Sequence, residues 1–452
     1  MTLVTAASGG DLALRDHVRR TLRLAGPVMA SRAGLLVMAT VDTVMAGWVG
    51  ADQLAWYGIA IAPQLAFLLI GTGLLMGTVV LTAQTDGAGH PERCGRIWRL
   101  ALLNAAAVGT LFAALLLPGE ALLLLLGQDP AIAAGGGAVL AMFALGMPAI
   151  MMYSATTLFL EGLGRPVPGM VVMAAANLVN LGLNWLLMFG PLELGAAGAA
   201  LATSLTRWFM FAALAGYVLL MPARARYRIL APLRGQWALA AKLARLGWPM
   251  ALSFGLESGA FFAAATFAGW QGASALAAWQ IILNTMALIY MLAIGLATAT
   301  AVRVGNAVGR RDQPGLARAG WVGLGIGVVI MLALMPVLYG ASAQIVGLYT
   351  ADPAVIAIAA PGLALAAWIL VGDASQGILT GALRGAADIW AALVIQVIAF
   401  WVICVPACYL LGQALGLGVP GLLWGLFLGV VVAALLLVAR FKVLAQRVVR
   451  PF

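Results

Sequence analysis

The chain of 452 residues is 64% hydrophobic and only 9% charged, with a mean hydropathy of +1.05. Soluble domains carry about 25% charged residues, so this composition excludes a soluble protein and predicts an integral membrane protein. The net charge of +10 would suggest nucleic-acid binding in a soluble protein, but here it indicates basic cytoplasmic loops. We therefore expect the lipid bilayer, and no nucleic acid, as a partner.

Apolar stretches of membrane-spanning length recur twelve times along the chain. They are too long for the roughly 10-residue alternating strands of an outer-membrane barrel, so we expect helices. In the first half they fall at roughly 24–48, 56–83, 97–117, 132–154, 168–190 and 195–220. In the second half they fall at roughly 246–270, 276–302, 317–339, 355–379, 391–412 and 418–440.

Charge alternates along the connections between these spans. The N-terminal segment, the loop after every second span and the C-terminal segment carry nearly every Lys and Arg. Because basic residues mark cytoplasmic loops, this alternation predicts twelve spans with both termini in the cytoplasm.

An internal repeat relates the two halves of the chain. The motif AGW at 46–48 recurs at 268–270, and DPA at 129–131 recurs at 352–354, so the two pairs of motifs are offset almost equally. Six spans return the chain to its starting side, so the two copies should be parallel, with a binding site between them. We therefore predict an all-α polytopic membrane protein with twelve transmembrane helices in two pseudo-symmetric six-helix bundles. The expected parts are an N-lobe, 1–222, a basic cytoplasmic interlobe loop, 223–245, and a C-lobe, 246–452.

Three acids lie in predicted spans: Asp42 in the first, Glu257 in the seventh and Asp373 in the tenth. An ionisable group at the bilayer centre costs at least ~2.5–3.5 kcal/mol on insertion scales, which makes each of them a functional candidate. Glu257 corresponds to Leu35 in the repeat register, and Asp42 corresponds to Ala264. These charges are therefore not part of the scaffold that the two copies share.

Each acid also has a structural interpretation. Asp42 could form an ion pair with Arg32 or Arg207, two arginines inside predicted spans that break the alternation of charge. Glu257 and Asp373 have no obvious basic partner in the predicted core of their own lobe.

Polar side chains in the fifth and sixth spans form a candidate N-lobe polar site. Asn177, Asn180 and Asn184 are spaced i, i+3, i+7, which places them on one helix face, and Thr203 lies in the next span. Carboxylate and amide oxygens suit Na⁺, whereas a desolvated carboxylate can carry a proton instead. We therefore expect a coupling ion, Na⁺ or H⁺, and no other cofactor. Buried amides also hydrogen-bond between helices without a further role, so that alternative stays open.

The seventh and eighth spans supply candidates for a substrate cavity, since aromatic faces favour cationic organic ligands. These candidates are Phe261, Trp279, Gln280 and Asn284. Taken one at a time, the aromatic residues are equally explained by packing.

No motif indicates an enzyme. The chain has no Walker A sequence, no HExxH and no GxGxxG between a strand and a helix. The loops are too short for a nucleotide-binding domain, so a primary pump is also excluded.

Several stretches together resemble the MATE family of multidrug and toxic compound extrusion transporters. They are VDTVMAGWVGADQLA (41–55), FLEGLGRPVP (159–168), NLVNLGLNWLLMFG (177–190), AAWQIILN (277–284), VRVGNAVGRRD (302–312) and ILTGALRGAAD (378–388). The resemblance implies two six-helix bundles around a V-shaped central cavity, and cation-coupled export of diverse organic cations.

Within that family the chain is most similar to the NorM-like branch. That branch carries acids in helices 7 and 10, matching Glu257 and Asp373, and the resemblance implies Na⁺ coupling there. Its helix-1 acid and helix-5 amides match Asp42 and the N-lobe polar site. The family's helix-10 Tyr, four residues before the acid, is Ile369 here.

We therefore expect a monomeric secondary antiporter of the bacterial inner membrane that exports cationic amphiphilic drugs by alternating access. Two alternatives remain. A lipid-linked precursor flippase would have a similar architecture with a basic cavity, and a polytopic membrane enzyme would need clustered acids, His or nucleophiles at a membrane face.

Overall fold

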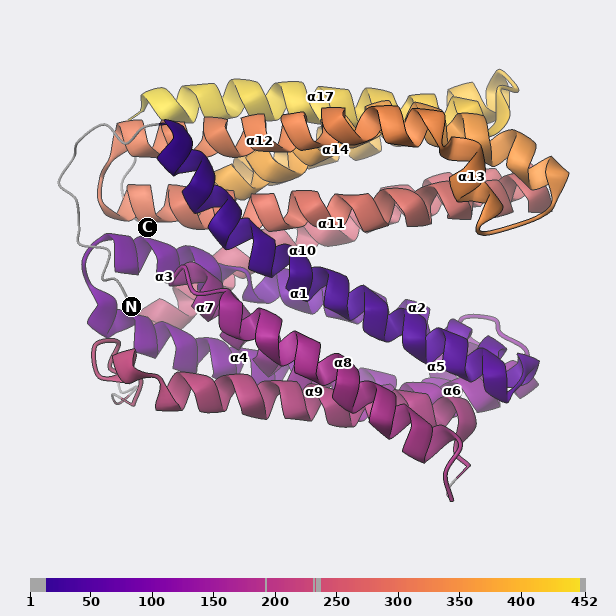
Figure 1. Cartoon of the computed structure of the whole chain (residues 1–452), viewed down its shortest axis with the longest axis horizontal. Coiled ribbons are helices and arrows are strands. Elements are labelled where there is room, and N and C mark those ends of the chain that lie inside the picture. The colour runs from indigo at the N-terminus through magenta and orange to yellow at the C-terminus, as the bar shows by residue number, and fades with distance from the viewer. Residues whose placement is uncertain (1–13, 192, 231, 233–236, 448–452) are drawn as a thin grey trace.

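The structure is a computed structural model that describes residues 14–191, 193–230, 232 and 237–447. Within these ranges the chain is helical, with short connections and no strand. Most helices of the first half lie in one group and most of those of the second half in another, while α1 (Leu14–Val49) runs from the second group to the first (Figure 1).

In the part of the chain that the structure describes, the first half is built from nine α-helices. They are α1 (Leu14–Val49), α2 (Ala51–Leu75), α3 (Gly77–Gly87), α4 (Pro91–Leu116), α5 (Gly119–Leu125), α6 (Pro130–Leu145), α7 (Met147–Gly162), α8 (Val167–Met188) and α9 (Gly195–Leu220). A short 3₁₀ turn, η1 (Pro222–Arg224), follows α9.

The second half follows the same order with fewer breaks. Its α-helices are α10 (Trp237–Trp270), α11 (Ala273–Gly309), α12 (Gln313–Gly340), α13 (Ser342–Gly347), α14 (Pro353–Gly385), α15 (Ile389–Gln396), α16 (Val405–Tyr409) and α17 (Gly418–Gln446). Two π-helical stretches, η2 (Val397–Cys404) and η3 (Leu410–Ala414), join α15 and α16 into one span.

The number of spans agrees with the prediction. Eleven helices in the described ranges are long and apolar enough to cross a membrane, and the bent pair α6–α7 makes twelve if it counts as one span. The pair bends by 44° at a break that Pro148 follows, and proline cannot donate a helical hydrogen bond. An all-α polytopic membrane fold is therefore confirmed.

The repeat is visible in the positions of the helices. The helices α2 and α11 begin at equivalent positions, Ala51 and Ala273, and α7 and α14 both end at the glycine that the repeat shares. Asp129 and Asp352, which are equivalent, both cap a helix: each side chain accepts a hydrogen bond of 2.9 Å from the backbone N–H two residues later. One expected boundary differs, since α10 begins at Trp237 and residues 237–245, assigned to the interlobe loop, are helical.

Each half has its own apolar core. The largest cluster of buried side chains lies mainly in the first half, and a second cluster lies entirely between residues 260 and 430. Folding each half around a separate core leaves the space between the two halves free to form a cavity.

The halves meet through close backbone contacts at glycine. A Cβ atom on Gly87 would lie 2.4 Å from the backbone oxygen of Asn306, and one on Gly309 would lie 2.2 Å from that of Gln84. Gly87 is the repeat equivalent of Gly309, and Gln84 is that of Asn306. Each half therefore contacts the other through equivalent residues, as expected for two copies related by a pseudo-twofold axis. The Gln84 side chain also donates a 3.0 Å hydrogen bond to the backbone oxygen of Gly385.

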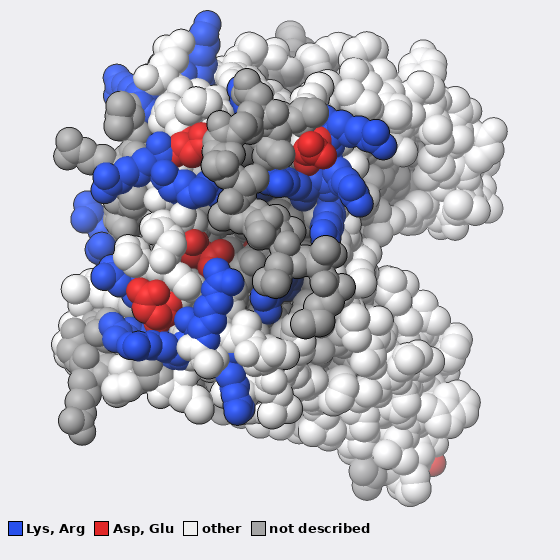
Figure 2. Space-filling model, turned by 60° about the vertical axis from the view of Figure 1, so that its left-hand side comes forward, with Lys and Arg blue, Asp and Glu red and all other residues white. Residues whose placement is uncertain are grey.

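Basic side chains gather at one end of the molecule (Figure 2). The start of α1 and the end of α17 lie at this end (Figure 1). Away from it, the surface is hollowed between the two halves (Figure 2).

Candidate functional site

A cavity of about 640 Å³ lies between the two halves. Its walls come from α1, α2 and α9 on one side and from α10, α11 and α14 on the other, and they are mainly apolar. Polar residues on the walls include Arg32, Asp42, Tyr57, Gln64, Thr203, Arg207, Glu257, Tyr290, Gln376 and Arg384. An apolar pocket of this size with a few convergent polar groups is typical of a small-molecule binding site.

The first polar group on these walls, the Asp42 cluster, consists of Asp42, Tyr57, Asn180, Asn184 and Thr203. The Asp42 carboxylate is 1% exposed and accepts three hydrogen bonds, from Asn184 at 2.6 Å, Thr203 at 2.6 Å and Tyr57 at 3.1 Å. The Asn180 amide closes the network by donating to Thr203 at 3.4 Å and accepting from Asn184 at 3.2 Å. Helices α1, α2, α8 and α9 thus converge on one carboxylate.

One acceptor in the Asp42 cluster is unused. The Oδ1 atom of Asn184 is buried and has no hydrogen-bond partner among the described residues. A buried unpaired oxygen beside a carboxylate is a position where a cation or a water molecule would restore the missing interaction.

Two members of the predicted N-lobe site turn out differently. Asn177 donates to the backbone oxygen of Met173 at 2.9 Å, so it satisfies its own helix and takes no part in the Asp42 cluster. Tyr57, which was not among the predicted site residues, donates a hydrogen bond directly to the Asp42 carboxylate. Its only signal was an aromatic residue in an apolar span, which packing explains equally well.

The two arginines considered as partners of Asp42 lie elsewhere. Arg32 contacts Glu161 of α7, with 3.7 Å between Nη2 and Oε1. Arg207 lies 5.5 Å from the centre of the Phe143 ring and interacts electrostatically with Asp42, but the two form no ion pair within 4.0 Å in the described part of the chain. Glu161, 2% exposed, is a further buried acid that was not predicted, because the predicted span ended at 154 whereas α7 continues to Gly162.

The second polar group, the Glu257–Asp373 cluster, lies on the wall formed by α10 and α14. Gln376, one helical turn after Asp373, donates to Glu257 at 3.3 Å and to Asp373 at 3.5 Å. The Oε1 atom of Gln376 is buried without a partner among the described residues. The structure therefore brings the two predicted acids together through an amide that had not been predicted.

A basic residue that was not predicted for this core lies near the acids, although it forms no ion pair within 4.0 Å with either of them among the described residues. Arg384 lines the same wall and interacts electrostatically with Glu257. The predicted span ended at 379, which assigned Arg384 to the cytoplasmic loop, but α14 continues to Gly385. Ile369, at the family's tyrosine position, is 1% exposed in the apolar core.

Of the four substrate-cavity candidates, only Phe261 lines the cavity. Trp279 is fully buried in the core of the second half. Gln280 and Asn284 are exposed, and Asn284 accepts a 3.0 Å hydrogen bond from the Tyr349 hydroxyl. The eighth span, α11, therefore presents its other face to the cavity, through residues such as Tyr290 and Met291.

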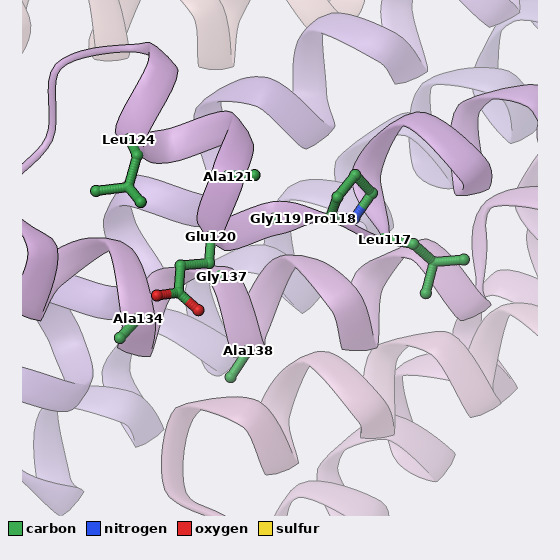
Figure 3. Close-up of a pocket in the computed structure, with 9 residues that line it drawn as sticks. All are labelled: Leu117, Pro118, Gly119, Glu120, Ala121, Leu124, Ala134, Gly137 and Ala138. Carbon is green, nitrogen blue, oxygen red and sulfur yellow. The ribbon is translucent and has the colours of Figure 1, made fainter.

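A shallower hollow of about 520 Å³ lies between α5 and α6 (Figure 3). Its only charged lining residue is Glu120, and none of the predicted site residues reaches it. It therefore contributes nothing to the two polar clusters.

Comparison with known proteins extends over almost the whole chain. The MatE family matches residues 27–186 and 249–410, one segment in each half. A probable multidrug resistance protein NorM of Caulobacter vibrioides is 36% identical over 431 residues, which cover 94% of this chain and 91% of that protein. The Bradyrhizobium diazoefficiens relative with the same description is 35% identical over 96% of this chain and 95% of its own length.

Solved structures show the same fold at lower identity. A eukaryotic MATE transporter superposes with a TM-score of 0.88 at 20% identity, covering 96% of this chain and 98% of its own. An outward-facing multidrug resistance MATE transporter of the MOP superfamily superposes with a TM-score of 0.87 at 20% identity, covering 97% and 99%. Because the family matches both halves and the two bacterial relatives align along nearly the full length, the chain belongs to the MatE family of membrane transporters.

Proposed function

We propose that the protein is a multidrug efflux transporter that couples the export of amphiphilic organic cations to the entry of Na⁺ or H⁺. One observation carries the proposal: the apolar cavity between the two pseudo-symmetric halves has one acid on each opposing wall, Asp42 on one and Glu257 on the other. Membership in the MatE family and the names of its NorM relatives support multidrug transport.

The basic end of the molecule sets the proposed orientation. Basic loops face the cytoplasm, so this end and both termini are proposed to be cytoplasmic in a bacterial inner membrane. The hollow between the halves then opens to the outside. The contact of Gly87 and Gly309 with the opposite half closes the cytoplasmic side.

Transport requires the two halves to exchange this contact for one at the outer end. Because each half has its own core, they can rotate as rigid bodies about the cavity. A cation that binds from outside to Glu257 and Asp373 removes the negative charge that attracts a cationic drug. Release of that cation inside restores the charge, so the drug and the ion use the cavity in alternation.

The membrane potential constrains this exchange. Moving one charge across the membrane is worth ~2.3 kcal/mol per 100 mV, but one-for-one exchange of monovalent cations moves no net charge. The exchange must therefore draw on a chemical gradient of the coupling ion, or use more than one ion per drug cation.

The flippase alternative expected a basic cavity. The walls do carry three arginines, Arg32, Arg207 and Arg384, and Arg32 is paired with Glu161. The lining carries two acids, Asp42 and Glu257, against these three arginines, so what disfavours the flippase is the family and not the charge: the similar NorM proteins are named for multidrug resistance. We therefore favour a cationic substrate over a pyrophosphate-linked lipid, and a transporter over a membrane enzyme.

The test is drug efflux from proteoliposomes with ΔpNa and ΔpH imposed separately. We expect Glu257→Gln to lose ion-driven ethidium export while it remains folded in the bilayer. Glu120→Gln, which neutralises an acid in the separate hollow of Figure 3, is the matched control and should export at the wild-type rate. Wild-type efflux from Glu257→Gln would refute the assignment, and transport of a lipid-linked precursor instead of ethidium would favour the flippase.

A further inference from the structure

Arg384 is a cavity residue that the proposed transport cycle leaves without a role. Its guanidinium carbon lies 4.9 Å from the centre of the Phe254 ring, a cation–π contact. Phe254 precedes Glu257 by three residues on α10, so the ring and the carboxylate share one helix face. The Arg384 guanidinium therefore stacks on the Phe254 ring, which shares a helix face with Glu257.

The arginine nevertheless does not bond to that acid. In the described part of the chain, Arg384 has no ion pair within 4.0 Å and no hydrogen bond, although it interacts electrostatically with Glu257 and Tyr290. The carboxylate of Glu257 is held by Gln376 instead. The contact with the Phe254 ring thus holds a positive charge near Glu257, while the carboxylate oxygens of Glu257 stay free of the guanidinium.

The repeat shows that this arrangement is specific to the second half. The equivalents of Phe254 and Arg384 in the first half are Arg32 and Glu161, which form an ion pair at 3.7 Å. At these equivalent positions, the first half therefore holds a neutral pair of opposite charges. The second half holds one arginine, on the helix equivalent to that of Glu161, with no ion-pair partner within 4.0 Å among the described residues.

The charges around the cavity consequently differ between the halves. In the first half two acids balance two arginines: Asp42, Glu161, Arg32 and Arg207. In the second half two acids and one arginine leave one negative charge: Glu257, Asp373 and Arg384.

We propose that Arg384 limits the Glu257–Asp373 pair to a single monovalent cation in each transport cycle. The proposal rests on the function proposed above, in which this pair binds the coupling ion. One cation brings the charge of the second half to zero, and a second would leave an unbalanced positive charge in a low-dielectric cavity. Gln376, 1% exposed and with its Oε1 atom unpaired among the described residues, is placed to complete that single site.

Two substitutions should shift cation binding in opposite directions. Arg384→Gln leaves the acid pair with two negative charges, so we expect a second bound cation and Na⁺ affinity raised about tenfold or more. Phe254→Leu removes the ring on which the guanidinium stacks and lets the guanidinium reach Glu257, so we expect Na⁺ affinity to fall roughly tenfold at an unchanged stoichiometry of one. A purely structural role for Arg384 would weaken binding in both variants.

The measurement is isothermal titration of the purified protein with NaCl at fixed pH, paired with proton uptake in weakly buffered solution. Arg384→Lys should keep a stoichiometry of one, because it keeps the charge. Phe267→Leu removes another ring from α10, one that packs against Tyr409 and does not line the cavity, and this variant should bind as the wild type does.

The outcomes separate the two proposals. If the wild type binds no cation that depends on Glu257, the proposed function fails. If it binds one such cation and Arg384→Gln leaves both number and affinity unchanged, only the role of Arg384 is overturned, as it is if the wild type binds two. Should Arg384→Gln fail to fold, Phe254→Leu decides, and unchanged Na⁺ affinity in that variant rejects the proposal.

Discussion

The two polar clusters occupy opposite walls of one cavity but bind their acids in different ways. Asp42 is surrounded by three donors from three other helices, whereas Glu257 and Asp373 share the single amide of Gln376. A carboxylate that accepts several short hydrogen bonds has most of its lost hydration replaced by protein. An acid pair with one shared donor does not, so it has more to gain from a cation. The comparison therefore supports the proposal that the second half binds the coupling ion, while the first half holds its acid in a hydrogen-bonded network.

The largest expected effect concerns the buried ion pair of the first half. Glu161→Ala leaves Arg32 with no carboxylate partner; breaking a buried pair on one side costs about 3–5 kcal/mol, and because Arg32 is 20% exposed we expect the lower end of that range. Arg384→Ala, at the position equivalent to Glu161, breaks no ion pair and should cost much less stability. Thermal unfolding in detergent measures both, and equal losses would contradict the difference between the halves. Adding Arg32→Met to Glu161→Ala should restore much of the lost stability.

The second prediction compares the acids themselves. Asp42→Ala leaves the donors of Tyr57, Asn184 and Thr203 without their acceptor and should destabilise the protein by about 1–3 kcal/mol. Asp373→Ala frees only one 3.5 Å bond from Gln376 and should change stability little while it impairs ion-driven efflux. Thermal unfolding and efflux are measured on the same preparations. A larger stability loss from Asp373→Ala than from Asp42→Ala would reverse the comparison.

The third prediction tests what the halves share. Asp129→Ala and Asp352→Ala each remove a helix N-cap with a 2.9 Å hydrogen bond, so each should cost about 1 kcal/mol in thermal unfolding. Both caps lie away from the cavity, and cation binding should be unaffected. Clearly unequal losses would show that the two copies of the repeat differ in stability even at equivalent positions.

The smallest expected effect is at Asn177, the predicted site residue that bonds only to its own helix. Asn177→Ala should alter stability by less than about 0.5 kcal/mol, the usual range for substitutions away from a special feature. Asn184→Ala, in the Asp42 cluster, is the matched comparison and should cost more while it weakens efflux. A defect in Asn177→Ala as large as that in Asn184→Ala would place Asn177 back in the site.

Much of the fold was predictable because hydropathy and repetition are properties of the chain itself. The spans and the parallel repeat follow from patterns within the sequence. The acids at membrane depth were also visible, since a charge inside an apolar run needs no structure to be recognised. Helix ends were less accurate: a span needs only about 20 residues, but α14 has 33 and carries Arg384 well beyond the predicted end.

The sequence by itself determined how many helices cross the membrane, that they form two copies of one unit, and which acids are costly enough to matter. Only the tertiary structure decided which residues meet. It brought Tyr57 to Asp42, Glu161 to Arg32 and Gln376 to both acids of the second half, and it turned Trp279 into the core and Asn284 outward. The reason is that hydropathy reports the average surroundings of a segment. The direction in which one side chain points depends on the rotation and crossing of neighbouring helices, which packing alone sets.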